Sequence, residues 1–412
     1  GIRVVGMDIS NAGESTFELI TNLHGDQGAY INIIENSFNL LQPPDLRRFE
    51  PKKRIDCAPS TSKADRFRLC LNFTQKVIVS LAMGQIQDQE LLERVDSIVL
   101  RLLNTFFSNN LISERYNLAF DHGWKSEEWQ NMPTLHDLLF FFSKEKLGIY
   151  DFGGIDERAI NQINNQVGAK LIDPNIGDAI GKPSNINPNP IMQFFALSGL
   201  TNENSSYIMA LVAQMACLNV ALESPKSLFV MDECSVLLAK RGFAEVVGER
   251  FATGRKEGQS VLVIGQDIDS ILASSSRSQI LTNTDIMLIG KTTSDAAETY
   301  SRELKIPWHL INRNASESFQ ANRQYQYSNW LLTRDDRYWD CLYFPSSYEL
   351  AALANSPDEK AARNRILKHF PDNINGLLHG TGEFAYQLNK AFTSNTPLSL
   401  IGQNNETEKT AA

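Results

Sequence analysis

The segment at residues 227–234, SLFVMDEC, contains the side chains best suited to chemistry. It is an apolar run that ends in two adjacent carboxylates, Asp232 and Glu233. In a parallel sheet, such a run places its carboxylates in the crevice at the carboxyl edge of the strands, where α/β proteins bind ligands. We predict a Walker B-like site in which Asp232 holds Mg²⁺ through its water shell and Glu233 orients or deprotonates an attacking water. The alternative is a strand that ends in an ordinary acidic turn.

A second segment of the same build follows at residues 254–267, GRKEGQSVLVIGQD. If the two strands are parallel neighbours, Gln266 lies near Glu233, where an amide can sense the γ-phosphate or position water. Arg255 and Lys256 precede the strand, at the opposite edge of the sheet. From there Arg255 can act on the nucleotide of a neighbouring subunit as an arginine finger, with Lys256 as a further nucleotide contact. The alternatives are a helix cap for Gln266 and a solvated turn for the two cations.

The opening run, IRVVGMD, ends on a third carboxylate, Asp8, and Ser10 follows it closely. We predict that both side chains approach the nucleotide, although an Asp at this place can also be a simple helix cap. The 5 cysteines and 6 histidines are scattered and have no ligand spacing. Magnesium at Asp232 is therefore the metal site that the sequence predicts.

The elements that position these residues are apolar runs separated by helical patterns, which predicts the α/β fold class. The runs are nearly continuous in apolar character, as expected for a parallel sheet covered on both faces. A hairpin is predicted to turn at Asp335 and Asp336. The predicted strands are IRVVGMD and GDQGAYINII in the first fifty residues, followed by IMQFFAL, SLFVMDE, SVLVIGQ and IMLIG, and the apolar character of the last four favours the parallel sheet.

Helical patterns occupy the region between the second and third of these strands. In residues 89–107, apolar side chains recur at steps of three and four, which is typical of one face of an amphipathic helix. Residues 148–190 are rich in Gly, Asn and Pro and predict a loop that returns to the sheet.

These patterns divide the chain into four parts. Residues 1–60 form the first part of an α/β domain, and residues 61–190 form an α-helical insertion with its return loop. Residues 191–345 form the second part of the α/β domain, and residues 346–412 form C-terminal helices with a polar tail.

The composition excludes several classes of protein. Of the 412 residues, 42% are hydrophobic and 21% are charged, which are ordinary globular values. The formal net charge of −9 argues against a surface that neutralises nucleic-acid phosphates along its length, so direct nucleic-acid binding is left open. The apolar runs are far shorter than the ~20 residues of a transmembrane helix, and we predict no such segment.

The order of the motifs resembles the C-terminal ATPase domain of the large type IV secretion and conjugation ATPases. This TraC-like class includes the DotO/IcmB type of Dot/Icm systems. Cys234 stands where the family has a small Ala, and we expect no consequence from it. The resemblance implies a RecA-like P-loop NTPase sheet with an inserted all-α subdomain, and it implies ATP and Mg²⁺ as cofactors. The motifs are, in order, the strand ending at Asp8, SNAGESTFELI, GDQGAYINII, SFNLLQPP, MPTLHDL, FVMDEC, GRKEGQSVLVIGQD and PDEKAARNRIL.

One motif of that family is absent from these 412 residues. A P-loop needs G-x-x-x-x-G-K-[ST], so that backbone amides wrap the phosphates at a helix N-terminus. The segments GDAIGKPS and DIMLIGKTT each contain Gly-Lys but lack the first glycine at the required distance. In the family the P-loop precedes the strand that ends at Asp8, so we expect it upstream of Gly1 and expect these residues alone to be inactive. The alternative is a degenerate member that does not hydrolyse ATP.

The function expected from the resemblance is a motor ATPase that powers assembly of the apparatus or transfer of substrate. The expected partners are other secretion-system ATPases, inner-membrane components and further copies of the chain in a hexameric ring. The expected location is the cytoplasmic side of the inner membrane. The alternatives are a non-hydrolysing docking module of the secretion complex and a DNA-pumping translocase of the same superfamily.

Overall fold

The computed structural model describes residues 2–9, 13–14, 16–17, 25–47, 49, 62–84, 86, 88–142, 147, 153–174, 176–197, 203–233 and 235–402. Contacts between residues divide the chain into two compact units. The first unit comprises Gly1–Asn11, Ala29–Gln266 and Ala273–Ile280, and the second comprises Ala12–Gly28, Asp267–Leu272 and Leu281–Ala412. The four predicted parts follow different boundaries and remain a proposal.

The first unit is built around a five-stranded sheet with the strand order β2-β3-β1-β4-β5. β1 pairs in parallel with both β3 and β4, and β4 pairs in parallel with β5. All five strands were predicted from apolar runs, and the predicted α/β fold class with a parallel central sheet is confirmed. The strands are β1 (Arg3–Asp8), β2 (Gly28–Asn32), β3 (Met192–Ala196), β4 (Ser227–Asp232) and β5 (Gln259–Val263).

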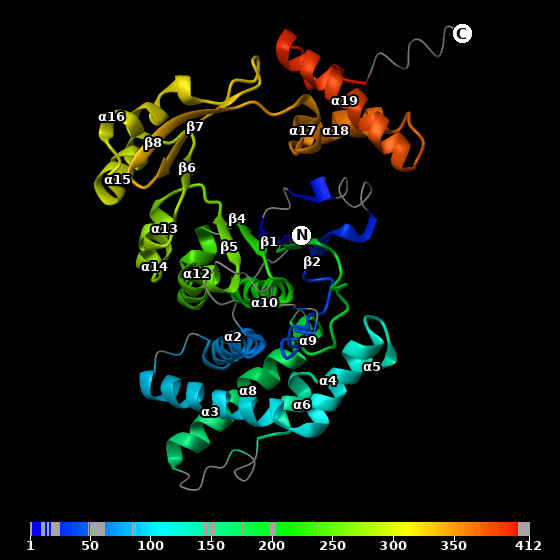
Figure 1. Ribbon diagram of the computed structural model, residues 1–412, viewed down its shortest axis with the longest axis vertical. Coiled ribbons are helices and arrows are strands. Elements are labelled where there is room, and N and C mark those ends of the chain that lie inside the picture. The colour runs from blue at the N-terminus through cyan, green and yellow to red at the C-terminus, as the bar shows by residue number, and fades with distance from the viewer. Residues whose placement is uncertain are drawn as a thin grey trace, which may run out of the picture. The chain divides into compact units, whose positions relative to one another are not determined.

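The helix that follows β3 fills the space under the sheet. α10 (Glu203–Leu222) contacts β1 and β4 on one side and helix α2 (Lys63–Met83) on the other. It is apolar on all sides, and residues 208–222 are all buried, as expected of a helix between two layers. Figure 1 shows this succession of sheet, α10 and α2.

The insertion is helical, as predicted. α3 (Gln89–Phe107) has the predicted bounds and buries the predicted apolar stripe. α2 begins with a capping box at Ser62 and ends at Gly84, whose φ of 54° favours glycine. This part also contains α4 (Asn110–His122), α5 (Glu127–Gln130), α6 (Leu135–Leu139) and α9 (Gly177–Ile180).

The prediction of a loop over residues 148–190 is wrong. α8 (Gly154–Ile172) lies within it and contacts α2 and α3. Its buried residues include Ala159, Ile163 and Val167, one per turn, whereas the rest of the helix is rich in Asn and Gln. This stripe is narrow, so the Gly-, Asn- and Pro-rich composition of the region did not reveal it. Packing against the apolar sides of α2 and α3 stabilises α8 despite its polar sequence.

The second unit contains an antiparallel sheet of β6 (Met287–Ile289), β7 (Ser328–Arg334) and β8 (Arg337–Tyr343). The hairpin of β7 and β8 turns at Asp335 and Asp336, both at positive φ, as predicted. Assigning IMLIG to the parallel sheet is wrong, because β6 pairs antiparallel with β7. Three residues are too few for an apolar pattern to indicate the strand's partner.

The remaining helices of the second unit form two apolar clusters. α15 (Ser294–Leu304) and α16 (Trp308–Ile311) contribute to the first cluster together with β6 and β7. α17 (Ser347–Ala352), α18 (Pro357–Leu367) and α19 (Ile374–Ser394) form the second. The predicted polar tail, QNNETEKTAA at residues 403–412, lies outside the described residues. The other described elements of the chain are α11 (Ser235–Leu238), α12 (Arg241–Thr253), α13 (Asp269–Ala273), α14 (Arg277–Thr282), η1 (Gly25–Gln27), η2 (Gly254–Glu257), η3 (Asn312–Ala315), η4 (Glu317–Phe319) and η5 (Leu398–Leu400). Within the described ranges, no helix combines the length and the apolar character that a membrane crossing requires.

Candidate functional site

Two of the predicted carboxylates lie side by side at the carboxyl edge of the parallel sheet. The register of β1 and β4 pairs Asp8 with Asp232, so that both strands end at the same level. Asp8 is 2% exposed, and Asp232 is half-buried. The body of the sheet behind them is apolar, with Met7 and Met231 fully buried in the preceding register pair. The two acidic side chains therefore lie at the end of a sheet whose preceding residues are apolar and buried.

A residue that the sequence analysis missed contacts Asp8. The hydroxyl of Tyr30, on β2, donates a hydrogen bond of 2.7 Å to Oδ2 of Asp8. Charge-assisted hydrogen bonds of this kind hold a carboxylate in a fixed orientation. The only signal in the sequence was a tyrosine within a strand candidate, which does not indicate a partner on another strand.

Glu233 follows the last residue of β4 and has an unusual backbone conformation. Its φ is 52°, in the left-handed region that non-glycine residues seldom occupy. Such conformations cost free energy and cluster at functional sites, where the surrounding structure imposes them. The tight turn aims the Glu233 side chain at the next strand of the sheet.

Gln266 is the residue that Glu233 contacts. It lies shortly after the end of β5, and its Nε2 donates a hydrogen bond of 3.1 Å to Oε1 of Glu233. Gln266 is exposed and Glu233 is half-buried, so the pair stands at the rim of the sheet. The structure thus brings together the two residues whose proximity the parallel strands predicted.

The electrostatics of this edge favour a cation. The pKa of Asp232 is raised above the ordinary value, first by burial and then by the negative charges of Asp8 and Glu233. Among the described residues, no Lys or Arg forms an ion pair with Asp232 or Glu233. A Mg²⁺ ion is commonly bound by one or two carboxylates together with waters and phosphate oxygens. The donor set at Asp232 fits that ion, although the described residues contain no group of three or more protein ligands that would form a closed metal cage.

The two predicted cations lie at the other edge of the sheet. Arg255 and Lys256 are exposed on the short turn η2, which precedes β5. A five-residue strand separates them from the level of Glu233, a span of ~17 Å at the usual rise of a strand. Within one chain the structure therefore does not bring them to the carboxylates. Ser10 and Cys234 lie outside the described residues.

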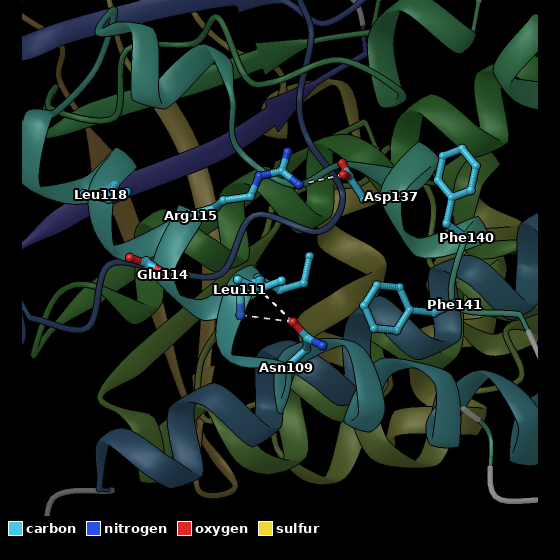
Figure 2. Close-up of a pocket in the computed structure, with 9 residues that line it drawn as sticks. Asn109, Leu111, Glu114, Arg115, Leu118, Asp137, Phe140 and Phe141 are labelled. Carbon is cyan, nitrogen blue, oxygen red and sulfur yellow. Dashed lines mark hydrogen bonds and ion pairs between the residues drawn. The ribbon is translucent and has the colours of Figure 1, made fainter. Parts of the chain in front are cut away.

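A surface pocket of about 660 Å³ lies elsewhere, in the helical part of the first unit. Residues of α4, such as Leu111 and Arg115, line one side, and Asp137, Phe140 and Phe141 line the other (Figure 2). An ion pair of 2.6 Å joins Arg115 to Asp137 across it. None of the predicted site residues lines this pocket.

A solved structure shares this fold at low sequence identity. No protein-family model matches the chain, and no curated protein matches it in sequence. Among solved structures, VirB4 of Thermoanaerobacter pseudethanolicus aligns with a TM-score of 0.56 at 13% identity, over 85% of this chain and 83% of that chain.

The bacterial conjugative coupling protein TrwB aligns less well. Its unbound form gives a TM-score of 0.39 at 10% identity, over 83% of this chain and 84% of that chain. TrwB in complex with ADP and Mg²⁺ gives 0.37 at 11% identity, with the same coverage. These lower scores carry no argument about this chain, whereas the alignment with VirB4 concerns the fold. The chain therefore has the RecA-like α/β fold of VirB4, and the resemblance to type IV secretion ATPases predicted from its motifs is confirmed at the level of the fold.

Proposed function

We propose that the chain is the ATP-hydrolysing motor part of a type IV secretion or conjugation ATPase. The observation that carries the proposal is the hydrogen bond between Gln266 and Glu233, next to Asp232 and Asp8 at the carboxyl edge of the sheet. This edge is where open α/β sheets bind ligands. The fold shared with VirB4 and the order of the motifs support the same assignment.

Each residue of the edge has a proposed role. Asp232 would hold Mg²⁺, which when bound neutralises charge on the nucleotide phosphates. Glu233 orients the attacking water and accepts its proton, and Gln266 fixes the Glu233 carboxylate and senses the γ-phosphate. Asp8, held by Tyr30, adds negative charge beside Asp232, and Ser10 is proposed to approach the nucleotide.

The cations on η2 are proposed to act between subunits. Arg255 is proposed to reach the nucleotide of a neighbouring copy in a homo-oligomeric ring of six, and Lys256 to contact the same nucleotide. The proposed partners are other secretion ATPases and inner-membrane components, and the proposed location is the cytoplasmic face of the inner membrane. These two proposals rest on the resemblance of the motifs.

The test is ATP hydrolysis by the full-length protein that contains this sequence, with Glu233→Gln as the variant. Loss of the base lowers kcat by about 10²–10⁴-fold. ATP affinity, measured by equilibrium binding, changes little because the amide keeps the shape of the side chain.

Glu114→Gln is the matched control, because Glu114 is an exposed carboxylate on α4, remote in sequence from the strand ends. It should hydrolyse ATP at the wild-type rate. Equal rates for Glu233→Gln and wild type would contradict the catalytic assignment. A wild-type protein that binds ATP without hydrolysing it would favour the docking module instead, and salt-dependent DNA binding would favour the translocase.

A further inference from the structure

Arg66, on helix α2, is a buried arginine at the amino edge of the sheet, remote from the carboxylates. It is 2% exposed, although arginine is seldom buried unless it is paired. Its Nη1 donates to the carbonyl oxygens of Leu222 and Ser224 at 2.7 and 2.9 Å, and its Nη2 donates to that of Glu257 at 2.7 Å. One side chain of the helical insertion thus binds both the C-terminal end of α10 and the turn η2.

The surroundings of Arg66 hold it in this position. The guanidinium stacks on the ring of Phe49, with 3.9 Å from Cζ to the ring centroid. Burial lowers the pKa of Arg66, and the charge of Glu257 opposes this effect. Carbonyl oxygens at the end of a helix carry partial negative charge, which favours a cation there. Arg66 therefore remains a charged group held by fixed acceptors and an aromatic ring.

A second buried arginine holds the other side of the same turn. Nη1 of Arg250, on α12, donates to Oε1 of Gln259 at 2.8 Å, and Gln259 begins β5 directly after the turn. A backbone hydrogen bond also holds the turn, because the Ser227 amide donates to the Gly258 carbonyl at 3.2 Å. Gly258 has φ 75°, and a side chain there would collide with the carbonyl of Pro225. The turn is thus confined between α2, α12 and the start of β4.

We propose that Arg66 is a positioning residue that fixes the turn η2, and with it Arg255 and Lys256, to the helical insertion. The two exposed cations stand on a turn whose last carbonyl, that of Glu257, accepts a hydrogen bond from Arg66. A displacement of α2 is therefore transmitted to Arg255 through the hydrogen bond of Arg66 to the turn, in addition to the contacts that α2 makes with α12. The effect of Arg66 on catalysis rests on the proposed function. The effect of Arg66 on the position of the turn does not depend on that function.

Hydrogen exchange on the chain itself tests the structural part. Arg66→Met removes three donated bonds, so the amides of residues 254–258 should exchange about tenfold faster or more. Trypsin should cleave faster after Arg255 and Lys256 for the same reason. Arg66→Lys, which keeps the charge and can bind one of the acceptors, should lie between wild type and Arg66→Met. It also serves as the variant to measure if Arg66→Met does not fold.

Arg115→Met is the matched control. Arg115 also belongs to the helical insertion and binds a backbone carbonyl, that of Asn131, at 2.8 Å, but it has no contact with η2. It should leave exchange at residues 254–258 unchanged. Unchanged exchange in Arg66→Met, or equal acceleration in Arg115→Met, would overturn the inference.

Hydrolysis by the full-length protein tests the catalytic part. Arg66→Met should lower kcat by about 10- to 100-fold with KM little changed, because a misplaced group loses transition-state contacts first. The double variant Arg66→Met/Arg255→Ala should be no slower than Arg255→Ala alone. If the effects of the two substitutions on kcat multiply, Arg66 does not act through Arg255 and the inference is wrong. Failure of the Glu233→Gln test would remove the proposed function, while the exchange measurement would still decide whether Arg66 holds the turn.

Discussion

The acidic residues at the end of β4 repel one another in the folded chain, and we propose that they serve ATP hydrolysis. Asp232 faces Asp8 across the strand pair and precedes Glu233 in the chain, so three carboxylates share one edge. The folded chain gains nothing from this repulsion. A divalent cation bound with nucleotide would relieve it, and we expect substitutions here to exchange function for stability.

Asp232→Asn is predicted to stabilise the protein at neutral pH when no nucleotide or metal is present. The pKa of Asp232 is raised in the folded state, so the folded chain holds this proton more tightly than the unfolded chain. Wild-type stability therefore falls as the pH rises from the ordinary value of 3.8 through the raised pKa. The variant lacks this loss and should melt about 1–2 °C higher at pH 7.

Calorimetry at two pH values checks the sign of this effect. The difference between Asp232→Asn and wild type should shrink as the pH approaches 4, because the wild-type carboxyl then becomes neutral as well. Glu114→Gln, which alters an exposed carboxylate without an ion pair among the described residues, should change the melting temperature at neither pH. A lower melting temperature for Asp232→Asn at pH 7 would contradict the electrostatic account.

At the scale of elements, the parallel strands could be predicted and the helix α8 could not. The sequences of β1, β3, β4 and β5 are apolar runs that stand apart from the helical patterns around them. Such a run can be recognised as a strand without knowing which other strands pair with it. α8 buries only one residue per turn, so its stability comes from α2 and α3, which are distant in sequence. Local patterns cannot report a stabilisation that arises on contact with other helices.

This account of α8 predicts a difference between two isoleucines of the same helix. Ile163 is 1% exposed and Ile172 is 82% exposed. Ile163→Ala should lower the free energy of unfolding by about 2–4 kcal/mol, because it removes buried methyl groups and leaves a cavity. Ile172→Ala should change it by no more than about 0.5 kcal/mol. Urea unfolding of both variants measures the difference, and similar values would mean that α8 does not pack as described.

The candidate site was predictable to the same extent as the strands. Parallel neighbouring strands end at one edge, which predicted that Gln266 lies near Glu233, and the hydrogen bond between the two side chains confirms that proximity. Tyr30 was missed because its hydrogen bond to Asp8 depends on a strand order that the sequence does not specify. Arg66 was missed because its partners are backbone carbonyls, which every residue type carries.

At the scale of the whole molecule, the chain consists of two units with separate sheets. The first unit contains the proposed catalytic edge, the proposed trans-acting turn and the helical insertion that Arg66 connects to that turn. The second has an antiparallel sheet and its own apolar clusters. Since the sequence identity to VirB4 is 13%, the fold rather than conserved residues relates the two proteins.

We propose that Glu233 and Gln266 act as one unit in ATP hydrolysis, and single-turnover hydrolysis by the full-length protein measures whether they do. Gln266→Ala should slow the chemical step by about 10- to 100-fold, since it frees the carboxylate that positions the water. In the Glu233→Gln background the same substitution should have no further effect, because residues that act together are not additive. If the two defects multiply, or if neither variant slows hydrolysis, the proposed active site is wrong.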